Sequence, residues 1–366
     1  MKLALPALPL LLFACTTAET PKQAVSEVEP APKDTLIADG EKHFKTLKKL
    51  TFGGDNAEAY WSFSGDRLIF QATNPAWGES CDQIYVFNPF TDDLAAKAPQ
   101  KISINGGRTT CSYFLPGDSM VLFGSTHEKD AACPAHPERR SDGKYVWPIY
   151  PSFDIFVSDL QGTIRKQLTS TPGYDAEATV SPKGDRIVFT SMRDGDMELY
   201  TMDLDGTDVK RITNTLGYDG GAFFSPDGTQ LLWRASRPKT PEEEMEYKAL
   251  LKEGLVMPTN MELYVANADG SDARKISDLG QANWAPFWHP SGKKIIFASN
   301  HTAERGFPFT LYLINSDGTG LEQVSFSDQF DAFPVFSPDG KYLVFSSNRA
   351  NGGTRETNLF LAEWVD

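Results

Sequence analysis

Short apolar runs recur along the chain at a fixed distance from a polar turn. Ser225-Pro226-Asp227-Gly228 leads into a run that ends at Trp233, and Ser337-Pro338-Asp339-Gly340 leads into one that ends at Phe345. Proline presets φ and glycine permits positive φ, so each frame predicts a turn that enters a β-strand. With degenerate copies included, six frames begin at positions 62, 115, 181, 225, 289 and 337, and each reaches an aromatic residue after the same step.

Two further strand patterns follow each frame. The third strand is a run such as Glu198 to Thr201 or Glu262 to Val265, and turns such as Asp205-Gly206 lead into a fourth strand. Successive frames lie as little as 44 residues apart. Four strands in a repeat of that length are typical of a β-propeller blade.

The two ends of the repeat region predict how the ring closes. The sixth copy ends after its third strand at Trp364, and an unclaimed fourth-strand pattern, Thr46 to Thr51, precedes the first copy. Pairing the two segments leaves no open sheet edge. We therefore predict an all-β fold, a six-bladed β-propeller closed by an N-terminal strand.

The Pro-Asp frames resemble the WD40-like repeats of the TolB family and of prolyl-oligopeptidase-type propellers, over residues 41–366. The closing segment Glu356 to Trp364 is also similar to the last blade of that family. This resemblance implies a scaffold that binds other molecules. TolB proteins carry an additional α/β domain before the propeller and are not usually lipidated, and this chain departs from both features.

The first residues have the pattern of a lipoprotein signal peptide. Lys2 precedes an apolar run, Leu3 to Phe13, that is too short to span a bilayer. Leu12-Phe13-Ala14-Cys15 resembles a bacterial lipobox, which implies cleavage after residue 14 and lipidation of Cys15; the alternative is an ordinary signal peptide with an incidental cysteine. Thr16 in place of Asp resembles the pattern sent to the outer membrane. Residues 15–40 have the composition of a flexible linker.

The net charge of −14 argues against nucleic acid as a partner and against a polybasic contact with anionic lipid. Contact with the membrane is therefore expected through the lipid anchor alone. We expect a monomeric outer-membrane lipoprotein, periplasmic or surface-exposed, with an envelope protein or peptide as its partner.

Polar residues recur at the predicted start of the innermost strands, at one mouth of the central channel. Six residues before their frames lie Asn56, Asp175, Asp219 and Asp331. Glu58 and Glu177 follow two residues later and, by the strand period of two, share the same face. These two glutamates are candidates for binding an amine or a hard cation such as Ca²⁺, although no spacing matches a defined metal motif. Replacing either glutamate with Gln should leave melting nearly unchanged.

A second set of polar residues follows the strand-end aromatics. Its ligand-binding candidates are His127, Arg193, Arg237, His301 and Arg349. One interpretation is that these arginines and the aspartates form ion pairs between blades and stabilise the ring. The other is that both sets face a ligand.

Two blades contain insertions between their second and third strands, at residues 128–152 and 238–260. The first insertion includes the aromatic candidates Trp147 and Tyr150, and the second has a helix start at Thr240 and a stop at Gly254. Both should overhang the mouth where the innermost strands begin, either as packing or as binding loops. The Pro-Asp-Gly turns should leave the opposite face little room for specific chemistry.

Three cysteines follow Cys15. In an oxidising compartment one disulfide and one free thiol are expected, and we favour Cys81–Cys133, with Cys111 in the channel. A zinc site formed by His127, Cys133 and His136 is an alternative, but its spacing fits no standard pattern.

The sequence favours a binding protein over an enzyme. Six blades occupy the chain, and neither a Gly-x-Ser-x-Gly elbow nor a His-Glu-x-x-His motif occurs. The alternative functions are a metal-assisted propeller hydrolase acting through Glu58 or Glu177, and an accessory subunit of a peptidase.

Overall fold

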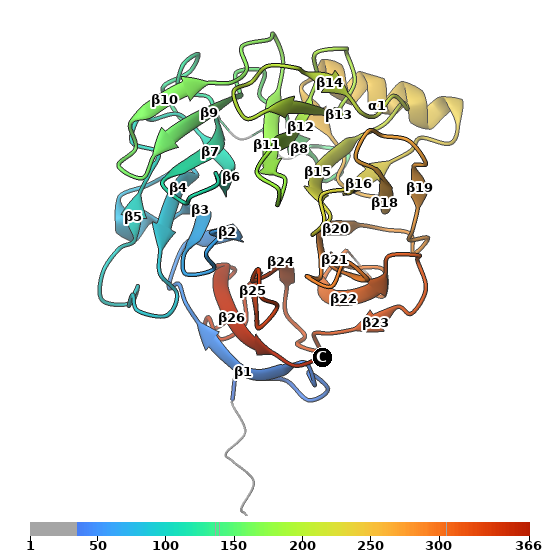
Figure 1. The fold of residues 1–366 in the computed structure, drawn as a ribbon. Coiled ribbons are helices and arrows are strands. Elements are labelled where there is room, and N and C mark those ends of the chain that lie inside the picture. Colours follow the sequence, from blue (N-terminus) through green and yellow to red (C-terminus); the bar gives the residue numbers. More distant parts are fainter. Residues whose placement is uncertain (1–34, 136, 139, 305) are drawn as a thin grey trace, which may run out of the picture. The chain divides into compact units, whose positions relative to one another are not determined.

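The computed structural model describes residues 35–135, 137–138, 140–304 and 306–366. Its strands form six four-stranded antiparallel sheets arranged around a central axis (Figure 1). The six predicted blades are therefore confirmed. From the centre outward, blade one contains β2 (Asp55–Trp61), β3 (Leu68–Thr73), β4 (Gln83–Phe87) and β5 (Gln100–Lys101); a 3-10 turn, Pro75–Trp77, follows β3.

The next three blades repeat this order. Blade two contains β6 (Thr109–Phe114), β7 (Met120–Ser125), β9 (Asp154–Asp159) and β10 (Ile164–Gln167). Blade three contains β11 (Asp175–Val180), β12 (Arg186–Ser191), β13 (Glu198–Asp203) and β14 (Lys210–Arg211). Blade four contains β15 (Asp219–Phe224), β16 (Gln230–Ser236), β18 (Met261–Asn267) and β19 (Arg274–Lys275).

The last two blades complete the ring. Blade five contains β20 (Asn283–Trp288), β21 (Lys294–Ser299), β22 (Thr310–Asn315) and β23 (Glu322–Gln323). Blade six contains β24 (Asp331–Phe336), β25 (Tyr342–Ser347), β26 (Asn358–Trp364) and the N-terminal β1 (Phe44–Lys49).

The ring closes by pairing of the two ends of the described chain. β1 runs antiparallel to β26, with Leu47 opposite Ala362 and Lys49 opposite Phe360. The predicted closure is confirmed, although the strand begins two residues earlier than expected. Leu36 and Ile37 also pack against the core, so contacts with the propeller begin before residue 41.

The repeated turn frame has a clear physical role in the blades. The Ser225 hydroxyl donates to Asp227 and accepts from the backbone amides of Thr229 and Gln230, while Gly228 has a φ of +67°. The aromatic residue five positions later packs between neighbouring sheets. All six of these side chains are almost completely buried: Phe70, Phe123, Phe189, Trp233, Phe297 and Phe345. Replacing such a core phenylalanine with Ala typically costs about 3–5 kcal/mol.

Every innermost strand contains a β-bulge at the same position. In β2 the register with β3 shifts between Ala57 and Tyr60, and the other five inner strands shift at the equivalent step. The bulge residues have positive φ and surround the channel; we call them the channel ring. They are Glu58, Cys111, Glu177, Gly221, Ala285 and Phe333. A bulge redirects one residue of a strand, and here it turns five side chains and the backbone of Gly221 inward.

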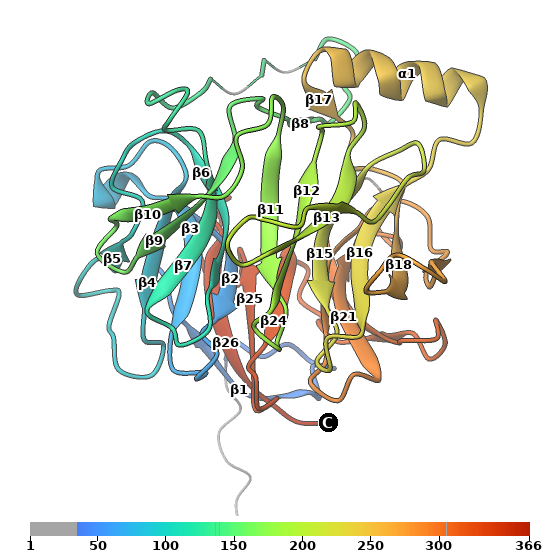
Figure 2. The same ribbon diagram turned by 45° about the horizontal axis from the view of Figure 1, so that its top comes forward.

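Both insertions lie at the same end of the ring. Blade two contributes β8 (Trp147–Pro148), and blade four contributes α1 (Pro241–Lys252) and β17 (Leu255–Val256). Figure 2 shows these three elements at the end where the innermost strands begin, opposite the Pro-Asp-Gly turns. We call these ends the insert mouth and the turn mouth. Within the described residues, no helix is both long and apolar enough to cross a membrane.

Candidate functional site

The insert mouth opens into a cavity of about 990 Å³. Its wall is rich in aromatic side chains, and its deepest part reaches the channel ring. The aromatic residues of the wall include Tyr145, Trp147, Tyr150, Trp284, Phe330 and Phe333. A large apolar wall with a few polar groups at its base is the usual form of a ligand site.

The two insertions form the roof of this cavity together. β8 and β17 pair antiparallel, with Val256 opposite Trp147. The Trp147 ring also lies 5.1 Å from the ring of Trp284 in blade five. Thr240 caps α1 by accepting from the amide of Glu243, as its sequence pattern predicts. The insertions are therefore held to each other and to the rim.

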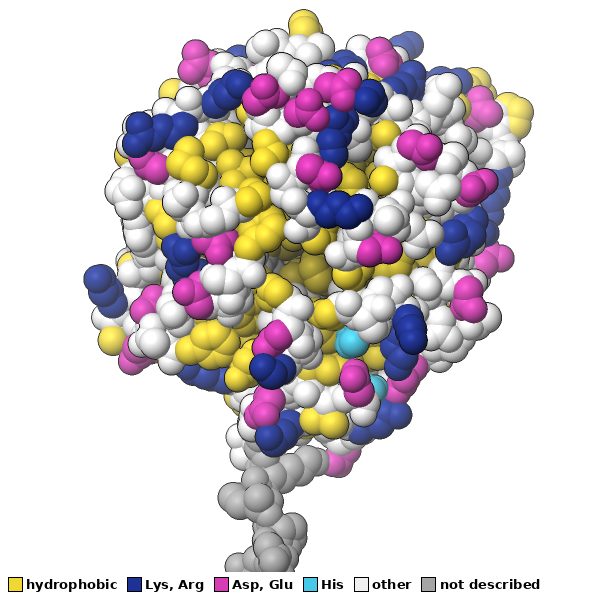
Figure 3. Space-filling view, in the orientation of Figure 1, with side chains coloured by type: hydrophobic (Ala, Val, Ile, Leu, Met, Phe, Trp, Pro, Cys, Tyr) yellow, Lys and Arg dark blue, Asp and Glu magenta, His cyan; other side chains and the backbone are white. Residues whose placement is uncertain are grey.

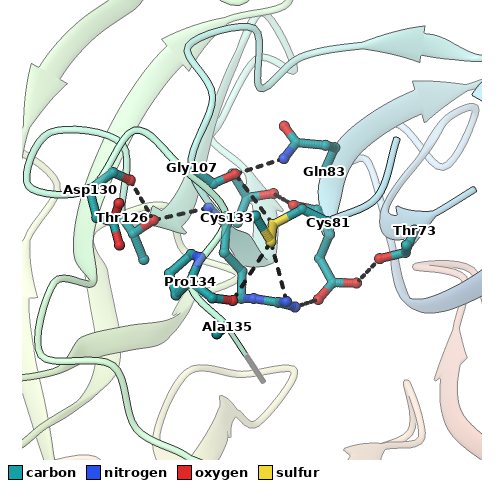
Figure 4. The surroundings of a disulfide bond; sticks show 12 residues. Thr73, Cys81, Gln83, Gly107, Thr126, Asp130, Cys133, Pro134 and Ala135 are labelled. Carbon is teal, nitrogen blue, oxygen red and sulfur yellow. Dashed lines mark hydrogen bonds and ion pairs between the residues drawn. A yellow bond between two sulfur atoms is a disulfide. The ribbon is translucent and has the colours of Figure 1, made fainter. Parts of the chain in front are cut away.

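A disulfide fixes the roof at its blade-one side. Cys81 follows β3, and it is bonded to Cys133 in the blade-two insertion, as we predicted (Figure 4). Arg108 forms an ion pair with Asp82 beside this bond. The guanidinium of Arg108 also lies 5.9 Å from the centre of the Tyr150 ring, so a roof aromatic is oriented from below.

Glu177 in the channel ring accepts hydrogen bonds from its own blade and from residues of blade four and the segment before it. Its carboxylate accepts from Thr190 at 2.8 Å, from Tyr218 at 2.9 Å and from the Gly221 amide at 2.9 Å. Arg234 donates to the same carboxylate at 2.8 Å, and both side chains are 11% exposed. A Cβ at position 221 would lie 2.1 Å from Arg234 Nη1, so glycine leaves the space that the guanidinium occupies. Glu177, which we expected to be a ligand-binding candidate, therefore already has a cationic partner in Arg234.

Glu58 has a different environment in the same ring. Among the described residues its carboxylate accepts one hydrogen bond, from the Cys111 thiol at 2.8 Å. Burial raises the pKa of Glu58, while the thiol hydrogen bond and the positive charge of Arg234 act in the opposite direction. Burial also raises the pKa of Cys111 well above its ordinary value, so this free cysteine is a protonated donor. Glu58 is thus a half-buried carboxylate that faces the cavity with a weak internal partner.

Below the channel ring, aromatic side chains close the channel. The Tyr60 ring lies 5.6 Å from Tyr113 and 5.7 Å from Phe223, which in turn lies 5.0 Å from Phe287. These contacts separate the insert mouth from a second cavity of about 200 Å³ at the turn mouth. Figure 3 shows hydrophobic side chains gathered around the hollow of this second face. We expected the turn mouth to leave little room for specific chemistry; it contains this hollow, which is lined mainly by aromatic and proline side chains.

The predicted aspartate and arginine sets form ion pairs, but within blades. Asp175 pairs with Arg193 at 3.1 Å, Asp219 with Arg237 at 2.6 Å, and Asp331 with Arg349 at 2.7 Å. The prediction of pairs between blades is wrong for a simple geometric reason. The first residue of each inner strand lies opposite the end of the second strand, as Asp175 lies opposite Ser191, so the arginine two residues later folds back onto it.

These three aspartates are also at most 1% exposed. They are absent from the lining of the cavity as the described residues define it. Arg349 makes further ion-pair contacts with Glu41, near the start of the propeller. We therefore assign these pairs to the stability of the blades and retain none of them as ligand residues.

The remaining polar candidates also have internal partners. Asn56 is fully buried and donates to the carbonyls of Gly53 and Thr357. The Nδ1 atoms of His127 and His301 lie 2.7 and 2.9 Å from serine hydroxyls two residues earlier. Burial lowers the pKa of both histidines. Their contacts indicate structural roles at the strand ends.

The metal alternatives gain no support from the positions of the side chains. The disulfide occupies the Cys133 sulfur that the zinc alternative requires, and His136 lies outside the described residues. Within the described part of the chain, no group of three or more His, Cys, Asp or Glu side chains is arranged to hold a metal ion. A divalent cation in the channel stays a prediction. The lipidation site Cys15 also lies outside the described residues.

Arg234 is the main site residue that the sequence interpretation missed. It interrupts the apolar run from Leu231 to Ala235 in β16, where a charged side chain needs a buried partner. Its equivalents in the other blades are Gln71, Gly124, Thr190, Ala298 and Ser346. The one charged residue at this repeated position could have indicated the ion pair with Glu177.

Comparison with known proteins agrees with the fold. Residues 141–244 match the family model of the TolB beta propeller domain. A TolB structure from Agrobacterium tumefaciens has 18% sequence identity and a TM-score of 0.53, with 86% of this chain and 91% of that chain covered. No curated protein sequence matches the chain.

Two solved enzymes share the architecture. An oligogalacturonate lyase from Vibrio parahaemolyticus has 10% identity and a TM-score of 0.52, with 89% of this chain and 95% of that chain covered. An oligogalacturonate lyase in complex with manganese has 12% identity and a TM-score of 0.50, with coverage of 87% and 93%. Likeness at this level of identity shows the fold and leaves the activity open. The chain is therefore a six-bladed β-propeller, and residues 141–244 are similar to the TolB beta propeller domain.

Proposed function

We propose that the protein is a non-catalytic binding propeller of the cell envelope that recognises a segment of a protein or peptide partner at the insert mouth. The observation that carries this proposal is the cavity of about 990 Å³, walled by aromatic side chains and roofed by both insertions. Such a cavity can enclose several side chains of an extended segment.

The rim of the cavity has the residue types that dominate protein interfaces. Tyr145 is 56% exposed and Phe307 is 62% exposed, although both are large apolar side chains. Trp147 and Tyr150 lie deeper; Trp147 contacts the Trp284 ring, and the Tyr150 hydroxyl donates to the carbonyl of Ala135. Rigid aromatic residues around a depression are typical anchors for a partner, because they bury a large area and lose little conformational entropy.

The disulfide of the roof supports the location in the cell envelope that this proposal includes. The Cys81–Cys133 disulfide is the kind of bond that persists in an oxidising compartment. We propose that lipidation of Cys15 retains the propeller at the outer membrane. Replacing Cys15 with Ser should move the protein to the soluble fraction and abolish fatty-acid labelling; unchanged membrane association together with an unlabelled native protein would contradict lipidation.

The polar groups of the channel favour binding over catalysis. A thiol with a raised pKa, as at Cys111, is a poor nucleophile. Glu177 and Arg234 are engaged with each other. The alternative is a metal-assisted hydrolase or lyase, and one structurally similar lyase was solved in complex with manganese. Among the described residues, however, no group of three or more His, Cys, Asp or Glu side chains is arranged to hold a metal ion. An accessory role beside a peptidase would use the same binding mouth.

Site-specific photocrosslinking in the native envelope tests the proposal. A photoreactive residue at Tyr145, on the rim, should capture a partner, and Trp147→Ala in the same chain should reduce the yield at least about fivefold. The matched control places the photoreactive residue at Val209, which is 41% exposed and outside the cavity. Equal capture from both positions, or capture that is insensitive to Trp147→Ala, would contradict the proposal.

A further inference from the structure

The base of the insert-mouth cavity contains more negative than positive side chains. Two carboxylates, Glu58 and Glu177, and one guanidinium, Arg234, lie at the base of the insert-mouth cavity. Arg234 donates to Glu177 and to the Tyr218 hydroxyl, at 2.8 and 2.9 Å. The hydrogen bonds of Arg234 therefore go to Glu177 and Tyr218, and Glu58 is left with a neutral thiol as its hydrogen-bond donor.

We propose that the insert mouth selects an organic cation, an amine or guanidinium on an apolar body, whose charged group pairs with Glu58. This inference rests on the proposed binding function and adds the charge class of the ligand. A cation at this position would supply the strong donor that Glu58 lacks inside the protein. Hydrogen bonds to charged groups are stronger than neutral ones when both partners are removed from water.

The cavity wall fits the apolar body of such a ligand. Phe333 belongs to the channel ring itself, and Trp147 and Trp284 lie above it in the wall. The Trp147 ring already lies 5.4 Å from the Arg234 guanidinium, so aromatic faces and cations occur together here. Flat aromatic faces attract both apolar groups and organic cations. The wall and Glu58 therefore favour the same ligand chemistry.

An organic cation fits this site better than a bare metal ion. A hard divalent cation needs several oxygen ligands at short range. The ring offers one carboxylate that has no ion pair among the described residues, beside a thiol and the apolar side chains of Ala285 and Phe333. A single charged hydrogen bond plus apolar contact suits an amine or a guanidinium.

The test uses matched probes on the purified full chain, measured by titration calorimetry. Phenylbutylamine is compared with neutral phenylbutanol, and the peptide acetyl-Phe-Lys-Phe-amide with the same peptide carrying norleucine in place of Lys. We expect the cationic member of at least one pair to bind at least about tenfold more tightly than its neutral match. A preference in the peptide pair alone identifies a protein segment as the source of the cation, and a preference in the amine pair alone identifies a small molecule.

Two variants locate the effect. Glu58→Gln keeps the side-chain shape and should bring the affinity ratio to within about twofold of unity, since no full negative charge remains. Asp328→Asn removes a carboxylate from the exposed rim of the same cavity and should leave the ratio unchanged. Thermal melting of each variant shows that it is folded.

The inference can fail separately from the proposed function. Equal affinity of cationic and neutral probes, lost in both cases with Trp147→Ala, would show a binding mouth without charge selection. If Glu58→Gln still bound the cationic probe more tightly than the neutral one, the cation would pair with another residue, and the assignment to Glu58 would be wrong. Failure of all four probes to bind would also overturn the inference of a cationic ligand. Photocrosslinking at Tyr145 would still test the proposed binding function separately.

Discussion

Removing Arg234 should destabilise the propeller through the carboxylate that it leaves behind. In Arg234→Met the Glu177 carboxylate, 11% exposed, would lose its only cationic partner among the described residues. Breaking a buried ion pair on one side costs about 3–5 kcal/mol. Neutral donors from Thr190, Tyr218 and Gly221 remain, so the lower end, about 3 kcal/mol, applies.

This cost translates into a measurable change of melting temperature. The entropy of unfolding is about 2.1 cal/mol/K per residue, which gives roughly 0.7 kcal/mol/K for a domain of about 330 residues. A loss of about 3 kcal/mol should therefore lower the melting temperature by about 4 °C. Glu58→Gln alters only the hydrogen bond from the Cys111 thiol and should change the melting temperature by less than about 1 °C.

Scanning calorimetry of a double-mutant cycle checks the reasoning. Glu177→Gln alone should also destabilise, because an amide cannot accept from all four donors. The variant with both substitutions should be more stable than the sum of the single losses by at least about 1 kcal/mol, because neither then leaves a charge unpaired. Additive losses, or an Arg234→Met protein that melts with the wild type, would refute the ion-pair account.

Three further predictions concern closure, the roof and pH. Deleting residues 41–49 removes β1 with the buried Phe44 and Leu47 and should cost about 5 kcal/mol or prevent folding; an unchanged melt would contradict closure by β1. Cys81→Ser should expose the blade-two insertion to limited proteolysis without unfolding the blades, whereas undigested insertion would mean that the disulfide does not hold the roof. Binding of the cationic probes should strengthen as pH rises through the raised pKa of Glu58, because the carboxylate gains its charge there, and Glu58→Gln should show no such rise. The groups that face Glu58 and must be considered in that titration are Tyr60, Asp82, Cys111, Glu177 and Arg234.

The blade count was predictable because its determinants are local. A turn frame and the aromatic residue five positions later, as in Ser181 to Phe189, repeat at the same spacing in each blade. The closure of the ring was predictable because the last blade has no fourth strand after Trp364 and an unclaimed strand pattern precedes the first blade. Each of these features is contained in fewer than about ten consecutive residues, the range over which turn and strand preferences act.

The contacts of the site were less predictable because they cross between strands. A period of two placed Asn56 and Glu58 on one face, but the bulge in β2 adds a residue, so Asn56 is buried and Glu58 faces the cavity. The bulge has no sequence mark that distinguishes it from a regular strand. The Glu177–Arg234 pair joins residues 57 positions apart on different blades, which no local pattern reports.

The backbone of the channel ring distinguishes Glu58 from its neighbours. Each ring position has positive φ, a conformation in which glycine is unstrained, yet only Gly221 is glycine. A side chain there costs about 1 kcal/mol or more in backbone strain, and contacts must offset it. Glu177 has its ion pair and Phe333 its aromatic wall, whereas Glu58 has one weak thiol donor. Because stability alone gives little reason for a carboxylate at this position, a ligand that completes its hydrogen bonding is the physical account that fits.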